Sequence, residues 1–183
     1  MRTIIVKLIY IIIILLITTI SIYNLHLGTL LAFLIGLNMY LERFYFKNFY
    51  LGKYNLRKLK DKTALKYFNE FLQDLDKNDD FNSIKYLQLD MYSFNLRAKT
   101  YNNIGLCYLE SKVYKKAQDY FNNAIKEDEK FCMPYYNLAI INMIKNKDDI
   151  AREYLNKSIK LGYNKIKFER LKSYVDFKYN TLK

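Results

Sequence analysis

The chain has little of what several structural classes require. Its 183 residues include five Gly, one Pro, two Cys, one His and no Trp. So few Gly and Pro residues exclude the collagen-like, Pro-rich and Gly/Ser-linker classes. Cys107 and Cys132 are too few for a disulfide-stapled secreted domain and form no Cys-x-x-Cys pair, so we expect both to be reduced. A hydrophobic fraction of 51%, with 17% aromatic residues, predicts instead a chain that folds.

Charged residues are also missing from most of the start of the chain. No Asp or Glu precedes Glu42, and residues 8–41 carry no charged side chain when His26 is neutral. The bases before Glu42 are Arg2 and Lys7. Most of the net charge of +12 therefore lies in residues 41–183. The sequence divides into an apolar segment and a basic body.

The uncharged run is longer than the roughly 20 apolar residues that one membrane-spanning helix needs. Two turn-prone residues, Asn24 and Gly28, interrupt it near the middle. We therefore predict a transmembrane helical hairpin anchor in residues 1–44, with spans of about 4–23 and about 25–44. A signal peptide is the competing interpretation, but the run exceeds an ordinary h-region and offers no small-residue cleavage site.

The orientation of this hairpin follows from the bases near its ends. Seven bases lie between Leu41 and Lys62, at the end of the second span and just after it, whereas the central turn carries only His26. The positive-inside rule then predicts that both termini and the body lie in the cytoplasm. We expect an integral membrane protein of the plasma membrane. Beside a membrane, we expect the basic segment to meet anionic lipid headgroups rather than nucleic acid, since no nucleic-acid reader motif accompanies it. Its bases are Arg43, Lys47, Lys53, Arg57, Lys58, Lys60 and Lys62.

Small residues recur at every fourth position of the second span, at Gly28, Ala32 and Gly36. Such a stripe lets two helices approach closely. We favour packing of this stripe on the first span. The alternative is a dimerisation face, and hence a homodimer.

The body repeats itself at a spacing of 34 residues. Tyr101 aligns with Tyr135, Ala117 with Ala151, and the match continues across a predicted turn. Each copy has apolar residues at helical spacing on both sides of that turn. The pattern predicts pairs of antiparallel helices that touch closely at small residues.

The first copy has the pattern Tyr101-x2-Ile104-Gly105-x2-Tyr108, followed by Ala117-x3-Phe121. This pattern resembles the tetratricopeptide repeat, with Tyr in place of Trp and Ile in place of Leu. The second copy departs from it at Asn142, where Tyr is expected, and at Glu129, where Pro is usual. The resemblance implies an all-α fold: a solenoid of antiparallel helix pairs over residues 45–180, with its clearest repeats at 98–131 and 132–165.

An earlier, degraded copy lies 53 residues before the first. Gly52 and Phe68 stand where Gly105 and Phe121 predict. The extra segment, residues 78–96, has helical spacing, and we expect it to lengthen the first helix of the next repeat. After the last repeat, Gly162 is expected at the C′ position of a helix, and residues 165–180 suit a terminal capping helix.

No arrangement of residues in the sequence predicts catalysis. His26 lies in the membrane turn, and neither cysteine has a His nearby in sequence to activate its thiol. The carboxylates cluster where helices should begin or end, which explains them better than acid–base chemistry does. Without a Gly-rich phosphate loop either, we expect no enzyme activity, no cofactor and no metal site.

The resemblance implies a groove lined by the first helix of each repeat, which would bind a protein or peptide client. The candidate residues are Lys99, Asn102, Leu106, Leu109, Met133, Tyr136, Ile140 and Met143. The other interpretation is that a capping or inserted helix covers Ile140 and Met143 as core.

The sequence therefore predicts a non-enzymatic, membrane-anchored adaptor for protein–protein interaction. One alternative is a structural subunit packed permanently on another membrane protein or on itself. Another, if the topology is reversed, is an extracytoplasmic assembly factor.

Overall fold

The computed structural model describes residues 12–13, 15–19, 22, 25–77, 93, 95–163 and 167–180. These residues are helical, apart from short connections, and include no strand. The all-α prediction is confirmed for this part of the chain. Most of the first expected span, and most of the extra segment 78–96, lie outside the described residues.

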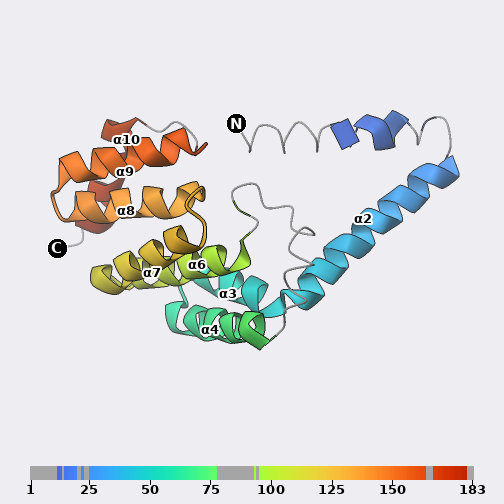
Figure 1. Cartoon of the computed structure of the whole chain (residues 1–183), viewed down its shortest axis with the longest axis horizontal. Helices are drawn as coiled ribbons and strands as arrows, with labels where there is room; N and C mark the ends of the chain where they lie inside the picture. Colours follow the sequence, from blue (N-terminus) through green and yellow to red (C-terminus); the bar gives the residue numbers. More distant parts are fainter. Residues whose placement is uncertain are drawn as a thin grey trace.

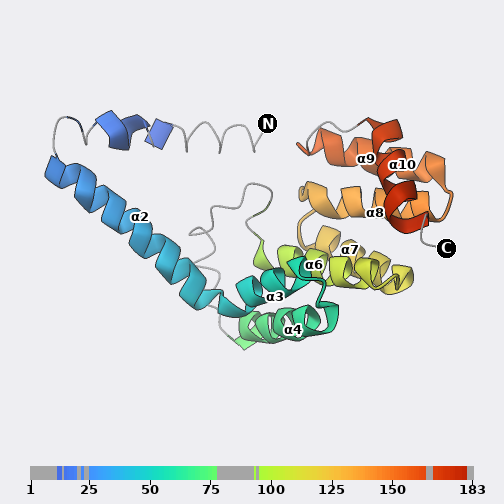
Figure 2. The ribbon, with the colours of Figure 1, turned by 180° about the vertical axis from the view of Figure 1, so that it is seen from behind.

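Three helix pairs stack side by side to form the body (Figure 1, Figure 2). They are α3 (Lys47–Arg57) with α4 (Asp61–Lys77), α6 (Leu96–Glu110) with α7 (Tyr114–Glu127), and α8 (Cys132–Ile144) with α9 (Asp148–Lys160). The first helices of neighbouring pairs contact each other, α3 against α6 and α6 against α8. This arrangement is an α-solenoid, in which each pair packs on the next.

The backbone repeats in the register that the sequence indicates. The turn inside each pair contains one non-glycine residue with positive φ: Leu59 at 55°, Lys112 at 59° and Asn146 at 56°. These residues are separated by 53 and 34 positions, which are the two offsets of the sequence alignment. The degraded copy therefore folds as a helix pair with the same turn.

Helix packing inside the first two pairs has the same register. A Cβ placed on Gly105 would lie 2.5 Å from Cε1 of Phe121, and one placed on Gly52 would lie 2.5 Å from Cε1 of Phe68. Both phenylalanine rings are fully buried. In each pair a glycine of the first helix lets the aromatic ring of the second helix reach its backbone.

Replacing Leu59 with glycine should stabilise the body by about 0.5–1 kcal/mol. Leu59 has a left-handed conformation that costs a non-glycine residue roughly 1–2 kcal/mol, and added flexibility of the unfolded chain offsets part of the gain. Thermal unfolding followed by circular dichroism measures the change. Ser111→Gly is the control, because Ser111 has an ordinary φ of −74° and should gain nothing. An equal response of both variants would contradict this explanation.

The extra segment does not lengthen α6, so that expectation was wrong. The helix begins at Leu96, and Asn95 before it has φ −81° and ψ 106°, outside the helical region. The Asn95 side-chain oxygen accepts a hydrogen bond from the backbone N–H of Ala98 at 2.9 Å. This N-cap marks the N-terminal end of α6.

Helix α2 (Leu25–Tyr45) projects away from the solenoid in both views (Figure 1, Figure 2). Its last turn joins the body, because the hydroxyl of Tyr50 donates to the buried carboxylate of Glu42. Phe46, between α2 and α3, packs edge-to-face on Phe71 of α4 at 6.0 Å between ring centroids. Among the described residues, no helix combines the length and apolar character needed to cross a membrane.

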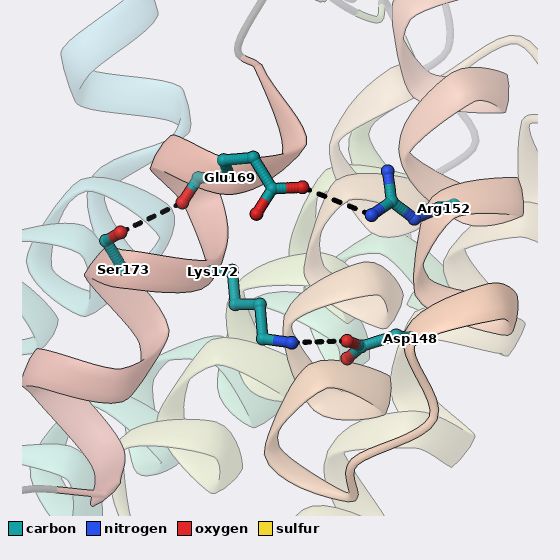
Figure 3. Close-up of polar contacts among 5 residues, drawn as sticks. All are labelled: Asp148, Arg152, Glu169, Lys172 and Ser173. Atoms are coloured by element: carbon teal, nitrogen blue, oxygen red, sulfur yellow. Dashed lines mark hydrogen bonds and ion pairs between the residues drawn. The ribbon is translucent and has the colours of Figure 1, made fainter.

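The chain after α9 folds back onto the last pair. Gly162 has φ 101° at the C′ position of α9, as expected. Next come α10 (Phe168–Val175) and one π-helical stretch, η2 (Asp176–Asn180). Figure 3 shows two ion pairs between α9 and α10: Lys172 with Asp148, and Arg152 with Glu169 at 3.1 Å. The helix lies where a terminal cap is expected.

Candidate protein-interaction site

The predicted groove lies on the first-helix face, which we define as the side of α6 and α8 that carries the eight candidate residues. Three of these side chains, Leu106, Met133 and Tyr136, are partly exposed. The other five are buried: Lys99, Asn102, Leu109, Ile140 and Met143. The structure therefore leaves a smaller open surface on this face than the sequence indicates.

Helix α10 covers the α8 end of this face. Leu171 and Val175 of α10 are buried in the same hydrophobic cluster as Ile140 and Met143 of α8. From η2, Nζ of Lys178 reaches across to Oε1 of Glu110, the last residue of α6, at 2.6 Å. The apolar residues at this end thus pack as core under the cap, and their role in binding a client stays a prediction.

One polar candidate, Asn102 of α6, contacts an asparagine of the next first helix, Asn137 of α8. The Asn137 side-chain amide of α8 donates to the Asn102 side-chain oxygen of α6 at 2.9 Å, and both residues are buried. Each side chain therefore uses one of its hydrogen-bonding groups in the contact with the other. A buried amide pair of this kind fixes the register between neighbouring repeats.

Tyr136 lies at the boundary between the covered and open parts of the face. Its ring centroid is 4.4 Å from that of Tyr163, in the connection that follows α9. Burial raises the pKa of the Tyr136 phenol, against an opposing hydrogen bond with Tyr163. Its hydroxyl therefore stays protonated at neutral pH and can donate a hydrogen bond.

The seven bases of the predicted lipid-facing segment do not form one cluster. Arg43 and Lys47 lie near the junction of α2 and α3. Lys53 lies within α3, with its Nζ 5.5 Å from the centre of the Phe49 ring. The remaining four, Arg57, Lys58, Lys60 and Lys62, surround the turn between α3 and α4, at the other end of an 11-residue helix.

Both cysteines are free and buried, Cys107 in α6 and Cys132 at the start of α8. Burial raises the pKa of Cys107 to about 12, and the nearby negative charge of Asp61 adds to the shift. The thiolate is the reactive form, so a thiol with this pKa is inert at neutral pH. The described residues also contain no group of three His, Cys, Asp or Glu side chains that could hold a metal ion.

We expect Cys107 to resist alkylation by iodoacetamide at pH 8 in the folded chain and to react fully in urea. Alkylation requires an exposed and deprotonated thiol, whereas in the folded chain the Cys107 thiol is buried and protonated. Mass spectrometry of chymotryptic peptides measures the modified fraction. Fast labelling of the folded chain would contradict the burial of Cys107.

The fold defines an α-helical repeat protein built from stacked helix pairs. A sequence model of the family described as Tetratricopeptide repeat matches residues 98–131, which include most of α6, all of α7 and the turn between them. That range coincides with the first of the two clear sequence repeats. No curated protein matches the chain. The chain thus contains a tetratricopeptide repeat, a module that generally binds protein partners.

Proposed function

We propose that this chain is a non-enzymatic adaptor that is held at a membrane by residues 1–44 and recruits a protein or peptide through its repeat body. The observation that carries the adaptor role is the stacked helix pairs, one of which matches the tetratricopeptide repeat. Such repeats form extended surfaces built on a rigid scaffold. The plasma membrane and a cytoplasmic body are part of this proposal.

Membrane attachment is supported by the surface of α2. Large apolar side chains are exposed along its whole described length: Leu30, Phe33, Leu34, Ile35, Leu37 and Met39 are between 39% and 65% exposed. Apolar side chains exposed in this number need lipid or protein around them. After these apolar residues the chain continues with Tyr40, Arg43 and Phe44. Aromatic and basic residues at the end of an apolar segment are typical of a membrane interface.

We expect the chain to stay with membranes after extraction with alkaline carbonate, and a reporter fused after Lys183 to be active in the cytoplasm. The physical reason is the uncharged run 8–41, followed by the bases from Arg43 onward. A matched variant that lacks residues 1–44 should move to the soluble fraction. Release of the full chain by carbonate would overturn membrane attachment, and an extracytoplasmic reporter would favour the assembly-factor alternative.

One observation favours the second candidate, a subunit packed permanently on another membrane protein or on itself. A Cβ placed on Gly36 would meet no atom of the described residues within 4 Å. This position of the small-residue stripe is therefore open to a close-packed helix. Cross-linking in intact membranes distinguishes the two functions, because a permanent partner is captured in a fixed ratio and remains bound after purification in mild detergent.

A further inference from the structure

The turns inside the three helix pairs lie on one edge of the solenoid. Figure 1 places them at the left of the body and Figure 2 at the right, so both views agree that they share an edge. We call residues 57–62, 111–116 and 145–150 the turn ridge. In the structure it joins segments that lie 54 and 34 positions apart in the sequence.

The turn ridge is strongly basic. Its three segments hold nine Lys or Arg residues and three acids, and all nine bases are exposed. Residues 74–77, 126–131 and 157–163, on the opposite edge, hold five bases and five acids. If the positive charge only reflected a lysine-rich composition, the two edges would have the same ratio of bases to acids. The excess positive charge therefore belongs to this edge.

Among the described residues, the acids near the turn ridge form no ion pair with its bases. Asp148 pairs with Lys172 and Glu110 with Lys178, both from the C-terminal cap, and Asp61 accepts a hydrogen bond from Ser111. Within the described part of the chain, none of the nine ridge bases takes part in an ion pair. Their positive charge is available to a ligand.

Apolar side chains are exposed at the same place. Between α3 and α9, the large apolar side chains exposed among the described residues are Tyr54, Leu59, Val113 and Ile150. The last three belong to the turn ridge, one in each segment, and Leu59 is 73% exposed. Tyr54 is adjacent, with Nζ of Lys58 4.4 Å above its ring. Each turn thus presents an apolar side chain among bases.

We propose that the turn ridge binds an acidic segment of a partner protein that also carries apolar side chains. Carboxylates complement the ridge bases, whose partners are neutral side chains such as Gln118 for Lys145 and Tyr54 for Lys58. Apolar side chains complement Leu59, Val113 and Ile150. The sugar–phosphate backbone of a nucleic acid would satisfy the first requirement but not the second. This inference rests on the proposed adaptor function and states where the partner binds and what chemistry it has.

The position of α2 argues against a bilayer as the ligand. Helix α2 leaves the body on the side away from the turn ridge (Figure 1, Figure 2). The 11 residues of α3 add about 16 Å between the end of α2 and the first ridge turn. This separation exceeds the screening length of about 8 Å at physiological ionic strength. A membrane that holds α2 would therefore contact Arg43 and Lys47 rather than the ridge.

The test uses the full chain in non-ionic detergent and a fluorescent synthetic peptide of glutamates with a leucine at every third position. Fluorescence anisotropy measures binding. The ridge variant Lys58→Glu, Lys112→Glu, Lys145→Glu should weaken binding about tenfold or more, since like charges repel across an interface. The control variant Lys126→Glu, Lys130→Glu, Lys160→Glu makes the same charge change on the opposite edge and should weaken it less than about threefold. Equal loss in the two variants would overturn the proposal.

A second variant tests the apolar component. Leu59→Ser, Val113→Ser, Ile150→Ser keeps every ridge base, so it should still bind polyglutamate of the same length. Its preference for the leucine-containing peptide should fall about tenfold, because the apolar contacts are lost. Ridge-dependent binding of phosphatidylserine vesicles or a single-stranded oligonucleotide, without binding of the peptide, would overturn the partner class.

Cross-linking in intact membranes separates this inference from the proposed function. If the wild-type chain and the ridge variant capture the same protein equally well, the adaptor function stands and the ridge proposal fails. If the wild-type chain captures no protein at all, the adaptor function fails, and the peptide assay still decides the chemistry of the ridge.

Discussion

Replacing Gly105 with alanine should lower the free energy of unfolding of the repeat body by about 1–3 kcal/mol. The new Cβ would lie 2.5 Å from Cε1 and 2.7 Å from Cδ1 of Phe121. The ring cannot turn aside, because it is fully buried between α6 and its neighbours. The helices of the pair would have to move apart, which loosens contacts along both. Urea unfolding followed by circular dichroism measures the loss.

Two other glycines provide matched comparisons for this variant. Gly52→Ala should cost a similar amount, since its Cβ would lie 2.5 Å from Cε1 of Phe68. Gly36→Ala should leave the stability of the body unchanged, because within the described part of the chain a Cβ there meets no atom within 4 Å. Adding Phe121→Leu to Gly105→Ala should restore part of the loss. Wild-type stability of Gly105→Ala alone would contradict the close contact between the helices.

The helix pairs could be predicted from the sequence because their close contacts depend on small residues that recur. Gly105 aligns with Gly52 and faces the same type of ring, so even the degraded copy keeps its packing signature. The start of α6 was missed for a local reason. Apolar residues keep a helical spacing through residues 78–96, so the sequence pattern shows no break there. The break comes from the side chain of Asn95, which caps the N-terminus of α6, and periodicity alone does not reveal such a cap.

The candidate binding surfaces were predicted less completely. The helix that covers the first-helix face, and the bases that form the turn ridge, come from segments far apart in the sequence. The spacing of Ile140 and Met143 places them on one face of α8, but whether that face is open depends on Leu171, in another helix. The turn ridge likewise forms only when three pairs stack on one another. A signal for it was present in the sequence: bases occur in every predicted turn inside a repeat.

Replacing Leu171 with alanine should lower the stability of the last helix pair by about 2–5 kcal/mol. Leu171 is 1% exposed and belongs to the cluster that contains Ile140, Met143 and Leu155. Its removal would leave a cavity between α10 and α8, and the ion pairs of α10 with α9 are too exposed to compensate for the lost packing. Thermal unfolding measures the loss.

Phe177→Ala is the matched control for Leu171→Ala, because Phe177 belongs to the same C-terminal segment but is 76% exposed. It should change stability by less than about 0.5 kcal/mol. The two variants also decide what the first-helix face does. If α10 covers core, Leu171→Ala should increase binding of an apolar dye such as ANS, as Ile140 and Met143 become accessible. If α10 instead competes with a client for this face, Leu171→Ala should increase client capture from membranes. A variant that melts like the wild type and gains neither signal would show that α10 does not hold this face closed.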